Sequence, residues 1–189
     1  MFNPMVNEIK KELRACMNGI LSARMREAGM PFRLIFGVEL PRLLNIAEEF
    51  PNDVNLANQL WEQNIRETRL LAIMLMPPEA FTQETANVWA KTMLTAEEAQ
   101  IMAMMLLPKT KHAKEVCMKW LKAGEPLSST CACLCLRHLL MQNVVFSKEE
   151  ILFLVECTSQ MLPTANLHLR KAIQALTDTI NREKIQNNS

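Results

Sequence analysis

The sequence predicts an all-α protein, a stack of antiparallel helix hairpins folded as one soluble domain. Its composition disfavours a sheet, because four glycines and no tyrosine are a poor supply for hairpin turns and pleated strands. Apolar residues recur with helical spacing between chain breakers, and no stretch is a credible strand. The length of 189 residues and the hydrophobic content of 49% suit a single domain with a sizeable core.

About ten helical segments follow from the apolar spacing and from the prolines, which lie at or between segment ends, where a missing N–H does least harm. In order, the predicted segments are 3–28, 38–50, 53–63, 65–76, 80–93, 95–107, 111–123, 127–143, 147–161 and 164–184. Two of them open with a capping box, in which a hydroxyl and a carboxylate bond to backbone N–H groups. These boxes pair Thr95 with Glu98 and Ser147 with Glu150.

Two of the later segments differ in how much of their surface they are expected to bury. Segment 95–107 contains the run Ile101–Leu107, which is apolar all round, as in a helix covered on most sides. Segment 111–123 carries a single apolar stripe that includes Val116 and Trp120. It should therefore bury one face only and leave the opposite face to solvent.

The three tryptophans recur at similar intervals. Trp61, Trp89 and Trp120 are spaced by 28 and 31 residues. Short links and a period of about 30 residues are typical of HEAT-like repeats, in which helix pairs stack side by side. We therefore expect a HEAT- or ARM-like right-handed superhelix forming a single domain over 1–185, followed by a frayed tail at 186–189.

Two stretches in the first half of the chain resemble one family. They are FGVELP at 36–41 and LWEQNIRETRLLA at 60–72. In order and spacing over roughly residues 5–160, the chain resembles the DNA alkylation repair family, whose members are HEAT-repeat solenoids and whose active members are alkylpurine DNA glycosylases. The second stretch also has a packing interpretation, in which its apolar residues lie between helices and Glu67 and Arg69 bond locally. The two interpretations are compatible.

The resemblance implies a catalytic tryptophan followed four residues later by an aspartate, whose carboxylate stabilises the positive charge that develops on the sugar. Trp89 is present, but Met93 stands where the aspartate belongs, and a thioether carries no negative charge. The family also places an arginine early in a later helix, where this chain has Thr130. Glu97 is the one rescue candidate, as a carboxylate shifted along the chain. We therefore expect a relative without glycosylase activity.

Basic residues gather in one segment, since 108–122 holds five lysines against Glu115 alone. Four of these lysines share one helix face, opposite the apolar stripe: Lys111, Lys114, Lys119 and Lys122. Such a face can neutralise phosphates without reading base sequence. We expect double-stranded DNA as the partner, with Trp89 stacking on a nucleotide. An ordinary solvated helix face is the alternative explanation for the lysines.

The charge balance keeps a second function open. Residues 51–100 carry three basic and seven acidic residues, and this acidity would repel a DNA backbone. The alternative is a helical-repeat scaffold that binds a protein or peptide in its concave groove. Neither function requires a cofactor, and none is expected.

Six cysteines, without a signal peptide or an apolar run of about 18 residues, indicate reduced thiols in a cytoplasmic protein that does not enter a membrane. Cys131, Cys135 and His138 fall on one helical stripe, which invites a zinc interpretation. One straight helix cannot surround a tetrahedral ion, so core packing is favoured and no metal is expected. The sequence carries no signal for an oligomeric state.

Overall fold

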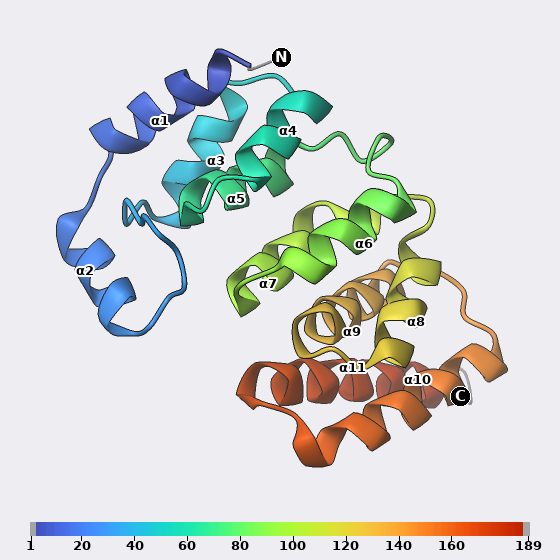
Figure 1. Cartoon of the computed structure of the whole chain (residues 1–189). Helices are drawn as coiled ribbons and strands as arrows, with labels where there is room; N and C mark the ends of the chain where they lie inside the picture. The colour runs from blue at the N-terminus through green and yellow to red at the C-terminus, as the bar shows by residue number, and fades with distance from the viewer. Residues whose placement is uncertain (1–2, 187–189) are drawn as a thin grey trace. The chain divides into compact units, whose positions relative to one another are not determined.

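The computed structural model describes residues 3–186, with side chains described for 3–182. Over these residues all regular structure is helical, in eleven α-helices and two short 3-10 helices. A single isolated bridge joins Leu34 to Ile65. The predicted all-α fold is therefore confirmed (Figure 1). None of the described helices is long and apolar enough to cross a membrane.

The chain divides between Phe81 and Thr82 into two compact units. Unit 1 contains α1 (Met5–Ala15), α2 (Gly19–Glu27), α3 (Leu40–Glu48), α4 (Val54–Trp61) and α5 (Arg66–Leu75). Unit 2 contains α6 (Gln83–Thr92), α7 (Ala96–Met105), α8 (Ala113–Ala123), α9 (Pro126–Met141), α10 (Lys148–Met161) and α11 (Leu167–Gln186). The single domain over 1–185 stays a prediction. The predicted frayed tail at 186–189 lies outside the described residues, apart from Gln186 at the end of α11.

The prediction of one helix over 3–28 is wrong, because the chain breaks there into α1 and α2. Asn18 begins α2 by accepting a hydrogen bond from the N–H of Leu21 at 3.0 Å. The same turn packs against Gly37, so closely that a Cβ on Gly37 would lie 2.6 Å from the backbone nitrogen of Ser22. The break therefore coincides with a local cap at Asn18 and with a contact to a segment distant in sequence, and the apolar spacing reveals neither.

The two stretches that carry the family resemblance meet inside unit 1. Glu67 on α5 is fully buried and accepts hydrogen bonds from the three consecutive N–H groups of residues 36–38 at 2.9–3.3 Å. It also accepts a bond from Arg66 at 3.0 Å. Glu67 therefore bonds locally to Arg66, as expected, and in addition to backbone donors 29–31 residues away, which the sequence did not indicate. Arg69 lies 3.8 Å above the Trp61 ring and donates to the Trp61 carbonyl.

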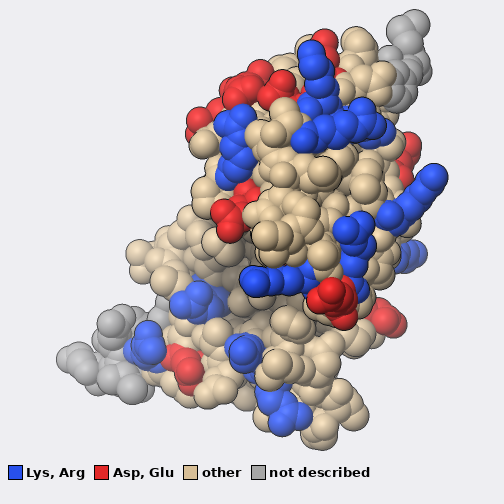
Figure 2. Space-filling view, turned by 90° about the vertical axis from the view of Figure 1, so that its left-hand side faces the viewer, with Lys and Arg blue, Asp and Glu red and all other residues tan. Residues whose placement is uncertain are grey.

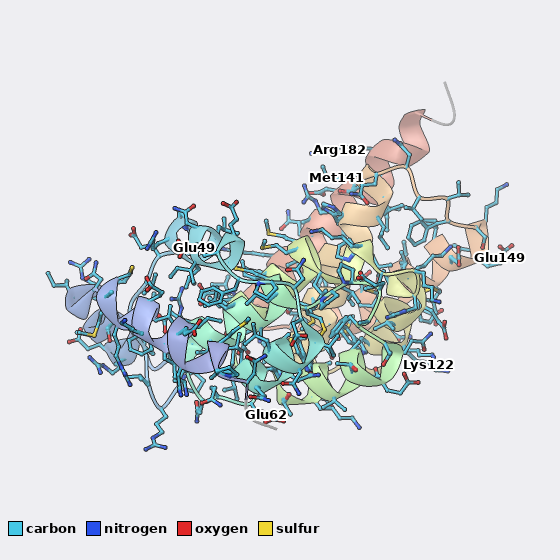
Figure 3. The ribbon with its side chains drawn as sticks, turned by 90° about the horizontal axis from the view of Figure 1, so that it is seen from above. Glu49, Glu62, Lys122, Met141, Glu149 and Arg182 are labelled. Atoms are coloured by element: carbon cyan, nitrogen blue, oxygen red, sulfur yellow. The ribbon has the colours of Figure 1, made fainter. Side chains whose placement is uncertain are left out.

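In unit 2 the central helix is α9, which packs against α7, α8 and α11. Many of its buried side chains are small, among them Ser129, Ala132 and Cys135, which lets the neighbouring helices approach closely. Figure 3 shows Met141 and Arg182 near one another, close to the C-terminal ends of α9 and α11. These two packed helices therefore run in the same direction.

The local signals read from the sequence hold in unit 2. Both capping boxes are present, at Thr95 and at Ser147. Segment 95–107 is covered on most sides, as expected, although Met104 is 60% exposed. Helix α8 buries one stripe that includes Val116 and Trp120, and so leaves its opposite face to solvent.

Candidate nucleic-acid interface

The four predicted lysines lie on and just before α8. Lys111, Lys119 and Lys122 are exposed, and Lys114 is half-buried. Helix α8 ends at Ala123 and is followed by Gly124, which has φ of 73°, so Lys122 lies in the last helical turn (Figure 3). The structure thus brings three exposed ammonium groups to one short segment of unit 2.

Lys114 makes one contact with the first turn of α10 and two with the segment before it. Its ammonium lies 2.6 Å from a carboxylate oxygen of Glu150, 3.1 Å from the carbonyl oxygen of Val145 and 4.6 Å from the centre of the Phe146 ring. Burial works against ionisation of Glu150, but the bonds from Lys114 and from the Ser147 N–H hold its pKa below the ordinary value. Lys114 therefore anchors a loop, and a DNA phosphate would have to compete with Glu150 for it.

Lys119 also has a carboxylate partner, but an exposed one. Its ammonium lies 2.7 Å from Glu115 on the preceding turn of α8 and donates to the side-chain oxygen of Gln83 at 3.1 Å. Gln83 in turn donates to Glu115 at 2.7 Å. The bond from Lys119, with that from Gln83, lowers the pKa of Glu115. These three side chains join α6 to α8.

A groove with a volume of about 730 Å³ lies between α6, α8 and the start of α9. Met93, Trp120 and Leu127 contribute apolar surface to it, and Lys91 and Lys119 line it from two different helices. Met93 ends α6 and is 6% exposed. At the position where the resemblance implies a carboxylate, this chain therefore presents a thioether to the groove.

The other residues singled out from the sequence lie away from this groove. Trp89 is 2% exposed, so the predicted stacking on a nucleotide would require its ring to leave the core. Thr130 is 1% exposed and donates to the carbonyl of Pro126 at 2.7 Å within α9. Glu97 is half-buried in the first turn of α7 and is not among the groove residues.

Asn87 is one of several groove residues that the reasoning from sequence missed. Asn87 lies one turn before Lys91 on α6, and its side-chain oxygen accepts a hydrogen bond from the Trp120 indole at 2.9 Å. That bond fixes the orientation of both side chains at the groove. Its only sequence signal was the spacing of four between Asn87 and Lys91, which places both on one helix face.

The cysteine stripe on α9 packs in the core. Cys131 and Cys135 are fully buried, and burial raises the pKa of the Cys131 thiol well above its ordinary value. His138 is bonded to Gln142 at 2.9 Å. Among the residues with described side chains, no three His, Cys, Asp or Glu residues come together as they would around a metal ion.

Charge is mixed over the surface as well as along the sequence. Figure 2 shows Lys and Arg in separate groups on one face, with Asp or Glu beside several of them. Such mixing reduces the long-range attraction of a polyanion and leaves local clusters of lysine as the places where phosphates are stabilised.

Comparison with known proteins agrees with this architecture. A solved structure described as "A new family of proteins related to the HEAT-like repeat DNA glycosylases with affinity for branched DNA structures" matches with a TM-score of 0.79 and 19% sequence identity, over 92% of this chain and 74% of that chain. The HEAT-like fold is therefore confirmed. No curated protein matches the chain. The family model described as "DNA alkylation repair enzyme" matches residues 9–176, and the chain therefore belongs to the DNA alkylation repair enzyme family.

Proposed function

We propose that the protein binds DNA through the lysines of α8 and does not excise alkylated bases. The observation that carries the proposal is the groove beside α8, which Lys91 and Lys119 line and in which Met93 occupies the position where the resemblance implies a carboxylate. Ammonium groups neutralise phosphates whatever the base sequence. A thioether, by contrast, supplies none of the negative charge that a developing sugar cation requires.

The lysines contribute unequally to this proposal. Lys111 and Lys122 are exposed and are the main phosphate contacts. Lys119 joins them at the edge of the groove, although Glu115 competes for it. Lys114 serves chiefly to anchor the loop before α10, because its ion pair with Glu150 is partly shielded from solvent.

The structural relative suggests which DNA to test. That protein belongs to a family with affinity for branched DNA structures. We therefore include branched DNA among the substrates proposed for this chain, next to the ordinary duplex expected from the sequence.

The experiment is fluorescence anisotropy with a labelled duplex and a labelled branched DNA at roughly 50 and 200 mM salt. We expect binding at the lower concentration that weakens steeply at the higher one. The variant Lys111→Gln/Lys122→Gln should bind more weakly, with the slope of log affinity against log salt reduced by about 2.

The matched control is Lys11→Gln/Lys148→Gln, which removes the same charge from exposed sites on α1 and α10. It should leave the slope close to that of the wild type. Absence of binding to either DNA at low salt would refute the proposal. The helical-repeat scaffold for a protein or peptide would then be the remaining function.

A further inference from the structure

We propose that helix α2 and the turn before it form a docking site for an acidic segment of another protein that also carries apolar side chains. The site lies in unit 1, so the inference goes beyond the proposed DNA interface on α8 and does not depend on it. It follows from three features of α2: how little of the helix is packed, which side chains it exposes, and the charge around them.

Helix α2 is attached to unit 1 mainly through its first turn. The N–H of Asn18 donates to the carbonyl of Phe36 at 3.0 Å, and the hydroxyl of Ser22 donates to the carbonyl of Ile35 at 2.6 Å. Among the residues of α2, all of which the structure describes, Ser22 alone is buried. In the described part of the chain, no other helix packs extensively against α2, which Figure 1 shows at the outer edge of unit 1. Most of the surface of α2 is therefore open to a partner.

Two long apolar side chains are exposed at this edge. Ile20, in the first turn of α2, is 71% exposed, and Met17, in the turn before it, is 58% exposed. Helical spacing places Ile20 and Arg24 together on the face opposite the buried Ser22. Along α8, whose side chains are all described, no large apolar side chain is exposed. Helix α2 thus offers apolar contact as well as charge, whereas α8 offers charge alone.

The charge around these apolar side chains is positive. Residues 10–33 include six basic residues against Glu12 and Glu27. Four of the six are arginines with exposed side chains: Arg14, Arg24, Arg26 and Arg33. Among the residues with described side chains, none forms an ion pair or a side-chain hydrogen bond with these four. A partner that carries carboxylates would therefore meet unoccupied guanidinium groups, which bind carboxylates through two parallel hydrogen bonds.

This combination favours a protein partner over DNA or a lipid surface. The centres of protein interfaces are enriched in Arg and Met and depleted in Lys, which matches the surface around α2 and differs from the lysine face of α8. Phosphates require charge only and gain nothing from Met17. A helix that lies in a membrane surface needs a continuous apolar face, but Ile20 is the only large apolar side chain exposed along the described residues of α2. We therefore expect a partner with carboxylates beside aliphatic or aromatic side chains.

The test is selection from random peptides displayed on phage, with the whole chain as the immobilised target. The wild type should enrich peptides rich in Asp or Glu and in Leu, Ile or Phe. The variant Ile20→Ser/Arg24→Gln removes an apolar and a charged group that lie one turn apart. It should weaken binding of the most enriched peptide about ten-fold or more in anisotropy titrations, because both groups lie at the centre of the proposed site.

The matched control is Leu167→Ser/Lys171→Gln. Leu167 is 63% exposed, and Lys171 is exposed one turn later on α11, so the control makes the same kind of change in unit 2. It should leave the peptide affinity within about two-fold. All four side chains are exposed, and circular dichroism establishes that both variants are folded. Selection of no peptide, selection of peptides without acidic residues, or an equal loss in the two variants would overturn the inference.

Three other occupants of α2 give different results, and each result would also overturn the inference. If Ile20→Ser/Arg24→Gln reduced the salt slope of duplex binding, α2 would belong to the DNA interface. If the wild type cosedimented with phosphatidylserine vesicles and this variant did not, α2 would be a membrane contact. If light scattering showed a wild-type dimer that the variant converted to a monomer, the occupant would be a second copy of the chain. DNA binding through α8 is measured separately, so failure here leaves the proposed function intact.

Discussion

Lys119 faces two anions in the proposed complex, its partner Glu115 one turn away on α8 and a DNA phosphate. The ion pair is more than half exposed on both sides, and exposed pairs contribute little to stability. Its effect on binding is different, because a phosphate must displace Glu115 or share the ammonium with it. Glu115 thus contributes little to the stability of the fold but opposes the proposed DNA binding.

The variant Glu115→Gln should therefore bind duplex DNA more tightly than the wild type. The amide removes the competing charge and frees Lys119, so the slope of log affinity against log salt should steepen by about 0.9, the value for one additional neutralised phosphate. Anisotropy titrations at several salt concentrations measure this slope. The melting temperature should stay close to that of the wild type, because exposed ion pairs contribute little to stability.

Glu62→Gln is the control for net charge, since Glu62 is exposed in unit 1. It makes the same change of one charge without touching α8 and should leave the slope unaltered. An equal steepening in both variants would mean that overall charge, and not release of Lys119, controls binding.

Gly37 shows the opposite case of a residue on which the fold depends. It has φ of 75° and lies against the turn that begins α2. Gly37→Ala should lower the free energy of unfolding by at least about 2 kcal/mol, because the methyl group adds a backbone clash to the cost of a left-handed conformation. Gly29→Ala is the matched control, with φ of 79° and nothing within 4 Å. It should cost about 1 kcal/mol in urea unfolding, and equal losses in the two variants would exclude the clash.

At the scale of elements, sequence reasoning succeeds where the determinants are local. The capping boxes at Thr95 and Ser147 mark the starts of α7 and α10 as predicted, because a cap depends on residues three positions apart. It fails at 3–28, where the Asn18 cap that begins α2 packs against Gly37, and at Glu67, whose backbone donors lie in another segment. Apolar periodicity reveals neither the cap nor the two long-range contacts.

The candidate site divides in the same way. Helical spacing alone predicted Lys111, Lys114, Lys119 and Lys122 on one helix face. The structure begins α8 at Ala113, so Lys111 lies before the helix, and only the other three lie on α8. The partners of those lysines were not predictable, because Glu150 and Gln83 come from other helices. Neither was the groove, which exists only once α6, α8 and α9 are packed together.

The burial of the six cysteines predicts which thiols react in the folded protein. Cys117, Cys131, Cys133 and Cys135 are buried, whereas Cys16 and Cys157 are half-buried. Burial raises the pKa of Cys133 to about 12, so the reactive thiolate is scarce at about pH 8. A small thiol reagent should label two cysteines of the native protein quickly and the other four only on unfolding.

The variant Cys16→Ser/Cys157→Ser checks the assignment of those two sites. It should be almost unreactive until denaturant is added, at which point four thiols should appear. Rapid labelling of a third cysteine in the folded wild type would show that the packing around α9 opens far more readily than its burial indicates.

At the scale of the whole molecule, the chain divides between Phe81 and Thr82 into two compact units, while the family match includes residues of both, over 9–176. The proposed interface lies wholly in unit 2, and the segments with the clearest family resemblance lie in unit 1. The motif at 60–72 thus serves packing around Glu67, so resemblance in that region carries no statement about chemistry.

We expect the protein to release no methylated purine from alkylated duplex DNA above the spontaneous rate. Loss of one preorganised charged group commonly costs about 10²–10³ in rate, and here two are absent. Met93 stands in the groove, and Thr130 is buried at 1% exposure, so Thr130→Arg should destabilise the core instead of restoring an active site. Chromatography of released bases, with an active glycosylase as reference, measures the rate. If the protein released methylated purine and Glu97→Gln abolished that release, the prediction would be wrong. Glu97, in the first turn of α7, would then be the catalytic carboxylate.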